Sequence, residues 1–191
     1  MMTILYQSND DLSIRNFLFY GKELVFGFAA VLYWRQISRK GDRMIREIRN
    51  NELNELLRLY LHLHEDSVPD DDRLRHTWER ICADDNHHII VNEVDGEIVS
   101  SCVCVIIPNL TRNVRPYALI ENVVTHFEYR GKGYATACLE YARDLAKSAG
   151  CYKMMLLTGS KDESTLHFYQ RAGYITAPTK PRLFSGCRRM L

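Results

Sequence analysis

The residues with the clearest chemical potential form a glycine-bearing turn at residues 130–133 (Arg-Gly-Lys-Gly), which leads directly into a helical pattern. A turn of this kind at a helix N-terminus directs several backbone N–H groups and the positive end of the helix dipole at one point. The turn therefore predicts a site for a phosphate or pyrophosphate. Two well-known phosphate loops do not fit. The chain lacks the P-loop spacing, and Thr136 stands where a dinucleotide fingerprint needs a small residue.

Two motifs follow one another in the order that a known family requires. Arg130, Gly133 and Ala135 match the pattern Arg/Gln-x-x-Gly-x-Gly/Ala, and residues 168–174 match the pattern aromatic-Tyr-x-x-x-Gly-Phe/Tyr. Together they resemble the acetyl-CoA loop and the second signature of the GNAT superfamily of N-acetyltransferases. The resemblance covers about residues 44–191. It implies an acyltransferase that moves an acetyl group from acetyl-CoA to a primary amine by direct attack.

The resemblance implies acetyl-CoA as co-substrate, with no metal. Backbone N–H groups of the turn would hold the pyrophosphate, and main-chain groups of the preceding strand would bind the pantetheine where that strand splays from its neighbour at a bulge. A backbone N–H there would also polarise the thioester carbonyl. Many relatives carry Asn seven residues before the tyrosine of the second motif, where this chain has Asp. The expected cofactor-binding residues are Val123, Val124, Thr125, Arg130, Gly131, Lys132, Gly133, Tyr134, Ala135, Thr136 and Asp162.

Glu121 is the best candidate for the base, or for the group that orients the amine, because an alkylammonium has a reference pKa of about 10. It shares strand parity with Val123 and Thr125, and it lies at the mouth side of the same strand. A carboxylate in a mostly buried strand is costly unless it is functional or paired, and Arg112 or Arg115 would be the pairing partner. His126 has a more suitable unperturbed pKa but the opposite parity. His126 and water remain the alternatives for the base.

Tyr169 matches the tyrosine that, in the family, protonates the leaving thiolate. The reference pKa values are about 8.5 for a thiol and about 10 for tyrosine, and this difference of about 1.5 units corresponds to roughly 2 kcal/mol. A positioned donor can overcome that difference. The alternative is a core aromatic residue on a helix, as we expect for Phe168 and Tyr174.

Strands and helices must position these residues, and the hydrophobic periodicity of the sequence predicts where those elements lie. β-branched residues lead up to the glycine turn, and an apolar face at helical spacing follows from Ala135 to the cap at Gly150. Asp95-Gly96 predicts a hairpin. Strands are expected at 44–48, 88–94, 97–107, 120–125, 151–158, 174–176 and 182–191, and helices from Asn51, at about 69–82, 135–149 and 163–172. The resulting fold class is α/β (α+β), with a single mixed, mostly antiparallel sheet flanked by helices, as in the GNAT acyl-CoA N-acyltransferase fold.

Residues 1–43 are the least typical part of the chain. The apolar run 24–34 is too short to span a bilayer, although the basic stretch 35–43 leaves an interfacial anchor open. We expect residues 1–43 to be an N-terminal extension of uncertain status, and residues 44–191 to be the GNAT acetyltransferase domain. Membrane association is not expected.

The composition suits one soluble domain, with 191 residues, 46% of them apolar, and a net charge of +1. This near-neutral charge gives no support to nucleic-acid binding. The six cysteines are scattered without a Cys-x-x-Cys pair, which predicts buried thiols and a cytoplasmic protein.

The acceptor is the least determined feature. Residues 120–124 and 150–153 resemble stretches of glucosamine-6-phosphate N-acetyltransferases, with Asn122 in place of an Asp. This resemblance implies an amino-sugar phosphate as the leading acceptor. Other small amines, amino acids, aminoglycosides and a protein N-terminus or lysine stay open, as does a homodimer. A non-catalytic acyl-CoA-binding regulatory module is the alternative function.

Overall fold

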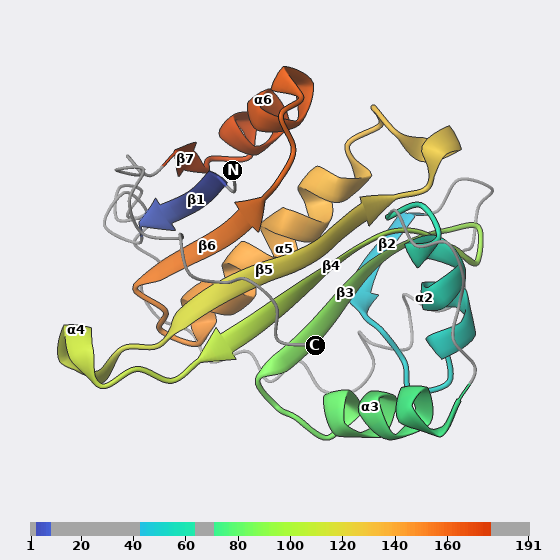
Figure 1. Cartoon of the computed structure of the whole chain (residues 1–191), viewed down its shortest axis with the longest axis horizontal. Coiled ribbons are helices and arrows are strands. Elements are labelled where there is room, and N and C mark those ends of the chain that lie inside the picture. Colours follow the sequence, from blue (N-terminus) through green and yellow to red (C-terminus); the bar gives the residue numbers. More distant parts are fainter. Residues whose placement is uncertain (1–2, 9–42, 64–70, 177–191) are drawn as a thin grey trace, which may run out of the picture.

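The computed structural model of the chain describes residues 3–8, 43–63 and 71–176 (Figure 1). Its strands are β1 (Thr3–Ser8), β2 (Arg43–Glu47), β3 (His87–Val94), β4 (Glu97–Ile107), β5 (Tyr117–Thr125), β6 (Lys153–Thr158) and β7 (Ile175–Thr176). Its helices are α2 (Leu53–Tyr60), α3 (Asp72–Cys82), α4 (Thr111–Val114), the short 3-10 helix η2 (Phe127–Tyr129), α5 (Tyr134–Ser148) and α6 (Glu163–Arg171).

The described strands form one sheet in the order β2-β3-β4-β5-β6-β1-β7. β5 and β6 run parallel, and every other neighbouring pair is antiparallel. The predicted mixed, mostly antiparallel sheet flanked by helices is confirmed. The expected hairpin is also present, because Asp95 and Gly96 take φ values of 50° and 86° between β3 and β4, as a tight two-residue turn requires.

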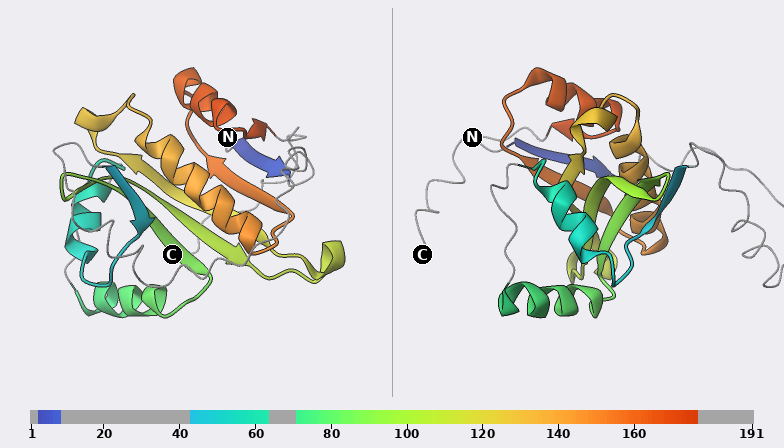
Figure 2. Two further views of the ribbon diagram at one scale, coloured as in Figure 1. Left: turned by 180° about the vertical axis from the view of Figure 1, so that it is seen from behind. Right: turned by 90° about the vertical axis from the view of Figure 1, so that its right-hand side faces the viewer.

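Helices cover both faces of the sheet (Figure 2). On one face α5 packs over β3, β4 and β5, and its buried side chains join those of α6 in a core that includes Cys102, Ile120 and Tyr169. On the other face α2 and α3 cover a second core that includes Leu56, Val103 and Val124. β5 contributes to both cores, so a change in its side-chain alternation alters which residues face which helices.

The start of the chain is part of the sheet. β1 pairs with β6 from Thr3 opposite Thr158 to Ser8 opposite Lys153, and it also pairs with β7. β1 therefore adds a strand to the sheet from within residues 1–43, and β2 lies where the first strand of the domain at 44–191 was expected. The possible interfacial anchor, and the strand expected at 182–191, lie outside the described residues.

The other expected elements are present with small shifts. α2 begins at Leu53 after Glu52 and not at Asn51, and Arg46 and Arg49 donate to the Glu52 carboxylate at this end of the helix. α4 lies between β4 and β5 and is a left-handed turn, because Arg112, Asn113 and Val114 all take positive φ values. Cys102, Cys104, Cys138 and Cys151 are buried free thiols and Cys82 is exposed. Among the described residues, no helix is long and apolar enough to cross a membrane.

Candidate active site

The candidate site is built around a β-bulge in β5. Ser101 of β4 pairs with Val124 and Val103 pairs with Glu121, so the two residues 122 and 123 lie opposite Cys102 alone. Asn122 takes the left-handed conformation with φ at 50°, which Asn tolerates better than most residues. The extra residue locally disrupts the ladder and redirects the side chains on either side of it.

The bulge separates side chains that sequence parity places together. Glu121 faces α2 and α3 with its partner Val103, whereas Val123 packs against the core beneath α5. Thr125 Oγ1 lies 2.8 Å from Ser100 Oγ on that second face. The expectation that Glu121 shares a face with Val123 and Thr125 is therefore wrong. The same bulge removes the parity argument against His126.

The bulge also coincides with the end of pairing between β5 and β6. These strands pair only from Ala118 opposite Met154 to Ile120 opposite Leu156. The rest of β5 therefore has no partner strand on that edge among the described residues. This is the splayed edge that the resemblance implied, and the main-chain groups of residues 121–123 that face it are available to an extended ligand.

On the α2 and α3 side, the bulge closes one end of a pocket of about 350 Å³. Side chains of both helices and of β3, β4 and β5 line it, including Tyr60, Trp78 and Glu121. Trp78 Nε1 donates to Asn50 O at 2.9 Å, which fixes the indole in the wall. The pocket and the splayed edge therefore lie on two sides of the same short segment of β5.

The Glu121 carboxylate lines the pocket, and no arginine of the described residues pairs with it. The two expected partners are engaged elsewhere: Arg115 donates to Gly150 O and Cys151 O, each at 3.4 Å, and Arg112 lies over the Tyr152 ring. Burial raises the pKa of Glu121 above its ordinary value. A carboxyl group whose pKa is raised by desolvation in a pocket is typical of a functional base.

A group of polar residues supports the bulge from the helix side. Tyr60, at the end of α2, interacts with the side chains of Asn122 and Ser101. Burial raises the pKa of Tyr60 to about 12, although the hydrogen bond with Asn122 opposes this. Ser101 Oγ is fully buried and has no hydrogen-bond partner of good geometry among the described residues. Sequence reasoning missed this contact, because Tyr60 and Asn122 lie 62 residues apart in the chain.

Tyr169 lies on α6, on the opposite side of β5 from the pocket. It is buried at 9% exposure and contacts the rings of Phe168 and Tyr174. Burial raises its pKa to about 12, and the charges of Cys102 and Glu121 add to this. Tyr169 and Glu121 are therefore close enough to interact electrostatically. The phenol stays protonated at neutral pH, as a proton donor must.

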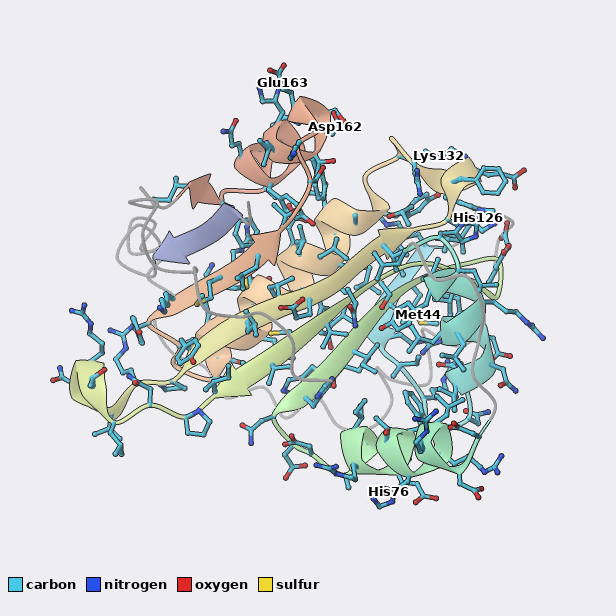
Figure 3. All side chains as sticks on the ribbon, viewed as in Figure 1. Met44, His76, His126, Lys132, Asp162 and Glu163 are labelled. Atoms are coloured by element: carbon cyan, nitrogen blue, oxygen red, sulfur yellow. The ribbon has the colours of Figure 1, made fainter. Side chains whose placement is uncertain are left out.

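His126 does not line the pocket. It lies just beyond β5, where Glu128 N donates to its Nδ1 at 3.3 Å and its ring stacks on Phe127. His62, at the end of α2, approaches with a ring distance of 4.4 Å. Figure 3 places His126 beside Lys132, at the end of the sheet that carries the glycine turn. Capping uses the Nδ1 lone pair, which makes His126 a weaker candidate base than Glu121.

The glycine turn has the expected form. Gly131 and Gly133 take φ values of 74° and 82°, and α5 begins at the next residue without a side-chain cap. Ala137 N is the first helix N–H bonded back to the turn, at 3.1 Å from Gly133 O. The N–H groups of residues 134–136 precede that bond. A Cβ at either glycine would meet only open space, so the turn leaves room in front of these donors for a ligand.

Five of the remaining expected cofactor residues have contacts within the protein. Arg130 Nε donates to Thr125 O at 3.2 Å, and Ser100 Oγ donates to Val124 O at 2.8 Å. The Lys132 ammonium lies 5.1 Å from the centre of the Tyr129 ring. Asp162 caps α6, with one oxygen accepting from Ser164 N and the other from Ser164 Oγ. Helix capping thus accounts for Asp162 without any contact to a ligand.

Arg43 of β2 contacts the glycine turn, and sequence reasoning missed this contact. Its Nη2 donates to Gly133 O at 3.1 Å, and its guanidinium lies 5.0 Å from the centre of the Tyr134 ring. Arg43 is 90 residues from Gly133, and nothing in the local sequence pattern connects the two. The contact anchors the first turn of α5 to the edge strand β2.

Comparison with known proteins agrees with this geometry. The model of the Acetyltransferase (GNAT) family matches residues 51–174, which include the bulge, the turn and Tyr169. The chain belongs to the GNAT family of acetyltransferases. The predicted family and fold are confirmed. GNAT proteins use acetyl-CoA, and the turn at the start of α5 and the splayed edge of β5 fit a pyrophosphate and a pantetheine arm.

Individual proteins are similar to parts of the chain. A glucosamine 6-phosphate N-acetyltransferase from Trypanosoma brucei brucei is 33% identical over 95 residues, covering 50% of this chain and 63% of that protein. Another from Arabidopsis thaliana is 31% identical over 109 residues, covering 56% and 71%. The solved structure of a candidate acetyltransferase from Agrobacterium tumefaciens str. C58 is 34% identical with a TM-score of 0.67, covering 73% of this chain and 98% of that one.

Proposed function

We propose that this GNAT protein transfers the acetyl group of acetyl-CoA to a primary amine by direct attack, with Glu121 as base and Tyr169 as acid. One observation carries the proposal. The bulge at Asn122 lies where β5 stops pairing with β6 and where the pocket under α2 and α3 ends. Glu121 in the pocket and Tyr169 across the strand thus flank the segment that would bind the thioester.

The main-chain N–H groups at the start of α5 would hold the pyrophosphate, and the free edge of β5 would hold the pantetheine. Acetyl-CoA supplies a thioester carbonyl, which a neutral amine can attack. The remaining assigned residues act through packing or loop shape, since Arg130 and Lys132 already contact Thr125 O and the Tyr129 ring. Backbone N–H groups carry most of the anion binding, as the helix dipole favours.

Glu121 accepts the proton that the attacking amine loses. The reference pKa values of an alkylammonium and a carboxyl differ by about six units, which makes the transfer unfavourable in water. Inside the pocket, burial raises the pKa of Glu121, and the same desolvation lowers the pKa of an ammonium. The two values approach each other, and the apolar walls therefore favour the transfer.

Tyr169 donates its hydroxyl proton to the sulfur as the carbon–sulfur bond breaks, and it later recovers a proton from solvent. With the Tyr169 pKa at about 12, the difference from a reference thiol is about 3.5 units, or roughly 5 kcal/mol. This exceeds the difference between the reference values. Tyr169 therefore acts mainly by a hydrogen bond to the developing thiolate, with complete transfer following only as the negative charge on sulfur grows.

Release of free CoA thiol from acetyl-CoA, measured with and without a panel of amines, tests the proposal. The panel contains glucosamine 6-phosphate, which the names of two relatives favour as acceptor, together with aminoglycosides, polyamines, amino acids, arylalkylamines and short peptides. The proposal requires amine-dependent release that falls in Tyr169→Phe. A regulatory acyl-CoA-binding module would instead bind acetyl-CoA and release no thiol with any amine.

A further inference from the structure

We infer that the acceptor carries its primary amine on a compact, uncharged and mostly apolar body, and that it is not an amino-sugar phosphate. The inference rests on the proposed function and concerns the pocket beneath α2 and α3. Nine of the fourteen described residues that line this pocket are apolar, from Leu53 on α2 to Val105 on β4. These apolar residues come from four elements, so the apolar character is not confined to one wall.

The pocket presents one charge, and that charge is negative. Glu121 is the only acidic residue among the described lining residues, and no Lys or Arg is present among them. His87 is the remaining ionisable base, and burial lowers its pKa despite the nearby Asp84, so it is neutral at neutral pH. An ammonium group is the charged group that this arrangement complements, and it would lie against Glu121.

Three arginines are already paired with carboxylates at the starts of the two helices. Arg46 and Arg49 bind Glu52 at the start of α2, and Arg73 binds Asp71 at the start of α3. None of these arginines lines the pocket. Both helix N-termini that border the pocket therefore already carry a carboxylate, and Asp71 also accepts from Leu74 N at 2.9 Å.

A phosphate in this pocket would be unfavourable for two reasons. It would face the Glu121 carboxylate, and it would lose its hydration without gaining the Arg, Lys or free helix N-terminus that proteins use for phosphate. An apolar body has the opposite balance, because each methylene it buries strengthens binding about fourfold. The volume of about 350 Å³ is near the low end of ligand pockets, which span roughly 300–1,000 Å³, so the body must be compact.

The test compares kcat/KM for acetylation across matched amines. The series contains n-propylamine through n-hexylamine, 2-phenylethylamine, glucosamine and glucosamine 6-phosphate. We expect kcat/KM to rise about fourfold per methylene until the pocket is full, and glucosamine 6-phosphate to be the poorest acceptor. A higher kcat/KM for glucosamine 6-phosphate than for 2-phenylethylamine, or no dependence on chain length, overturns the inference and leaves the proposed function intact.

A direct measurement of amine binding distinguishes a failure of the proposed function from a failure of the inference about the acceptor. If no amine is acetylated, the proposed function fails, and calorimetric titration of the full chain with 2-phenylethylamine and with glucosamine 6-phosphate still decides the inference. Tighter binding of 2-phenylethylamine supports an apolar acceptor pocket. Tighter binding of glucosamine 6-phosphate, or equal binding of the two, contradicts it.

A charge placed in the wall provides a second test. Leu74 lines the pocket from α3, a helix with no fully buried residue, so Leu74→Lys should fold. It should lower kcat/KM for 2-phenylethylamine by about tenfold and raise the relative rate with glucosamine 6-phosphate. His76 lies on the same helix with its side chain directed away from the sheet (Figure 3), and it does not line the pocket. His76→Lys is the matched control and should change neither rate. An unchanged preference in Leu74→Lys contradicts the inference.

Discussion

Replacing Glu121 with Gln should lower activity and raise stability at the same time. Glu121 is the only charge among the described residues that line the pocket, and burial raises its pKa. A charged hydrogen bond to an ammonium contributes about 1.5–3 kcal/mol, which corresponds to a factor of roughly 10–150 in kcat/KM. Loss of the proton acceptor adds a factor of about 10²–10⁴. We therefore expect Glu121→Gln to lower kcat/KM by at least about 10³-fold.

The pH dependence of the same variant gives an independent readout. In the wild type, kcat/KM should fall on the acid side as Glu121 becomes protonated, at a pH above the ordinary glutamate pKa. Glu121→Gln should lack this limb. An unchanged rate and an unchanged acid limb would refute the assignment and move the base to His126 or water.

The stability change follows from the same raised pKa. Because the folded protein holds the Glu121 proton more tightly than the unfolded chain, the stability linked to Glu121 falls as pH rises through its folded pKa. At neutral pH this destabilisation is complete, and Gln removes it. Thermal melts should show a higher Tm for Glu121→Gln at pH 7 and a smaller difference near pH 4. Glu140→Gln, at an exposed position on α5, is the matched control and should change neither rate nor melting.

Three further substitutions test other parts of the account. Tyr169→Phe should lower kcat by about 10²-fold, with little change in the acetyl-CoA affinity measured by calorimetry. Tyr174→Phe is the control, because it removes a buried hydroxyl without a described partner, and it should leave kcat unchanged. Equal effects of the two substitutions on kcat would contradict the role of Tyr169 as acid. Gly133→Ala, at a φ of 82°, should destabilise the fold by about 1–2 kcal/mol and raise KM for acetyl-CoA. Gly150→Ala, at a φ of 72° on the other end of α5, should destabilise similarly with KM unchanged, and a rise in KM there would contradict the anion site. Arg46→Met should lower the free energy of unfolding by about 1–3 kcal/mol in chemical denaturation at pH 7, because it leaves the Glu93 carboxylate, 18% exposed, without its partner and leaves Glu52 with Arg49 alone. A loss below about 1 kcal/mol would mean that this network does not hold α2 in place.

The Arg46 network also predicts a pH effect. Burial acts to raise the pKa of Glu52, but hydrogen bonds from Arg46 and from Arg49 N outweigh it and hold the pKa below its ordinary value. The stability that Glu52 contributes is therefore present above pH 4.5 and is lost as pH falls below it. Acid titration of the wild type followed by circular dichroism should show this loss, and Arg46→Met should show less of it.

Local patterns predicted most of the fold correctly. The Asp95-Gly96 turn, the strand before the glycine turn and the long helix after it are each encoded by a few neighbouring residues. The glycine turn and Tyr169 could be identified for the same reason, since each belongs to a short motif. The role of β1 could not be predicted from local patterns, because its partners, β6 and β7, lie about 150 residues further along the chain.

The arrangement of the site depended on features that periodicity does not encode. Strand parity assumes two residues per repeat, and the bulge at Asn122 breaks this rule within the catalytic segment. A bulge with Asn in the left-handed region has no reliable sequence signature. The contacts of Tyr60 with Asn122 and of Arg43 with Gly133 likewise arise from packing between distant elements. Parity grouped Glu121 with Val123 and Thr125, whereas Glu121 lines the pocket on the opposite face of the sheet from Val123.

The most direct test of the central claim is to quantify CoA thiol and N-acetylated amine in the same reaction of the full chain with acetyl-CoA and a primary amine. Acetyl transfer by direct attack predicts equal amounts of the two products. It also predicts no acetylated protein after rapid quenching and no thiol release with the N,N-dimethyl form of the same amine. Thiol release without N-acetylated amine, or an acetylated protein that accumulates before product, would contradict the account.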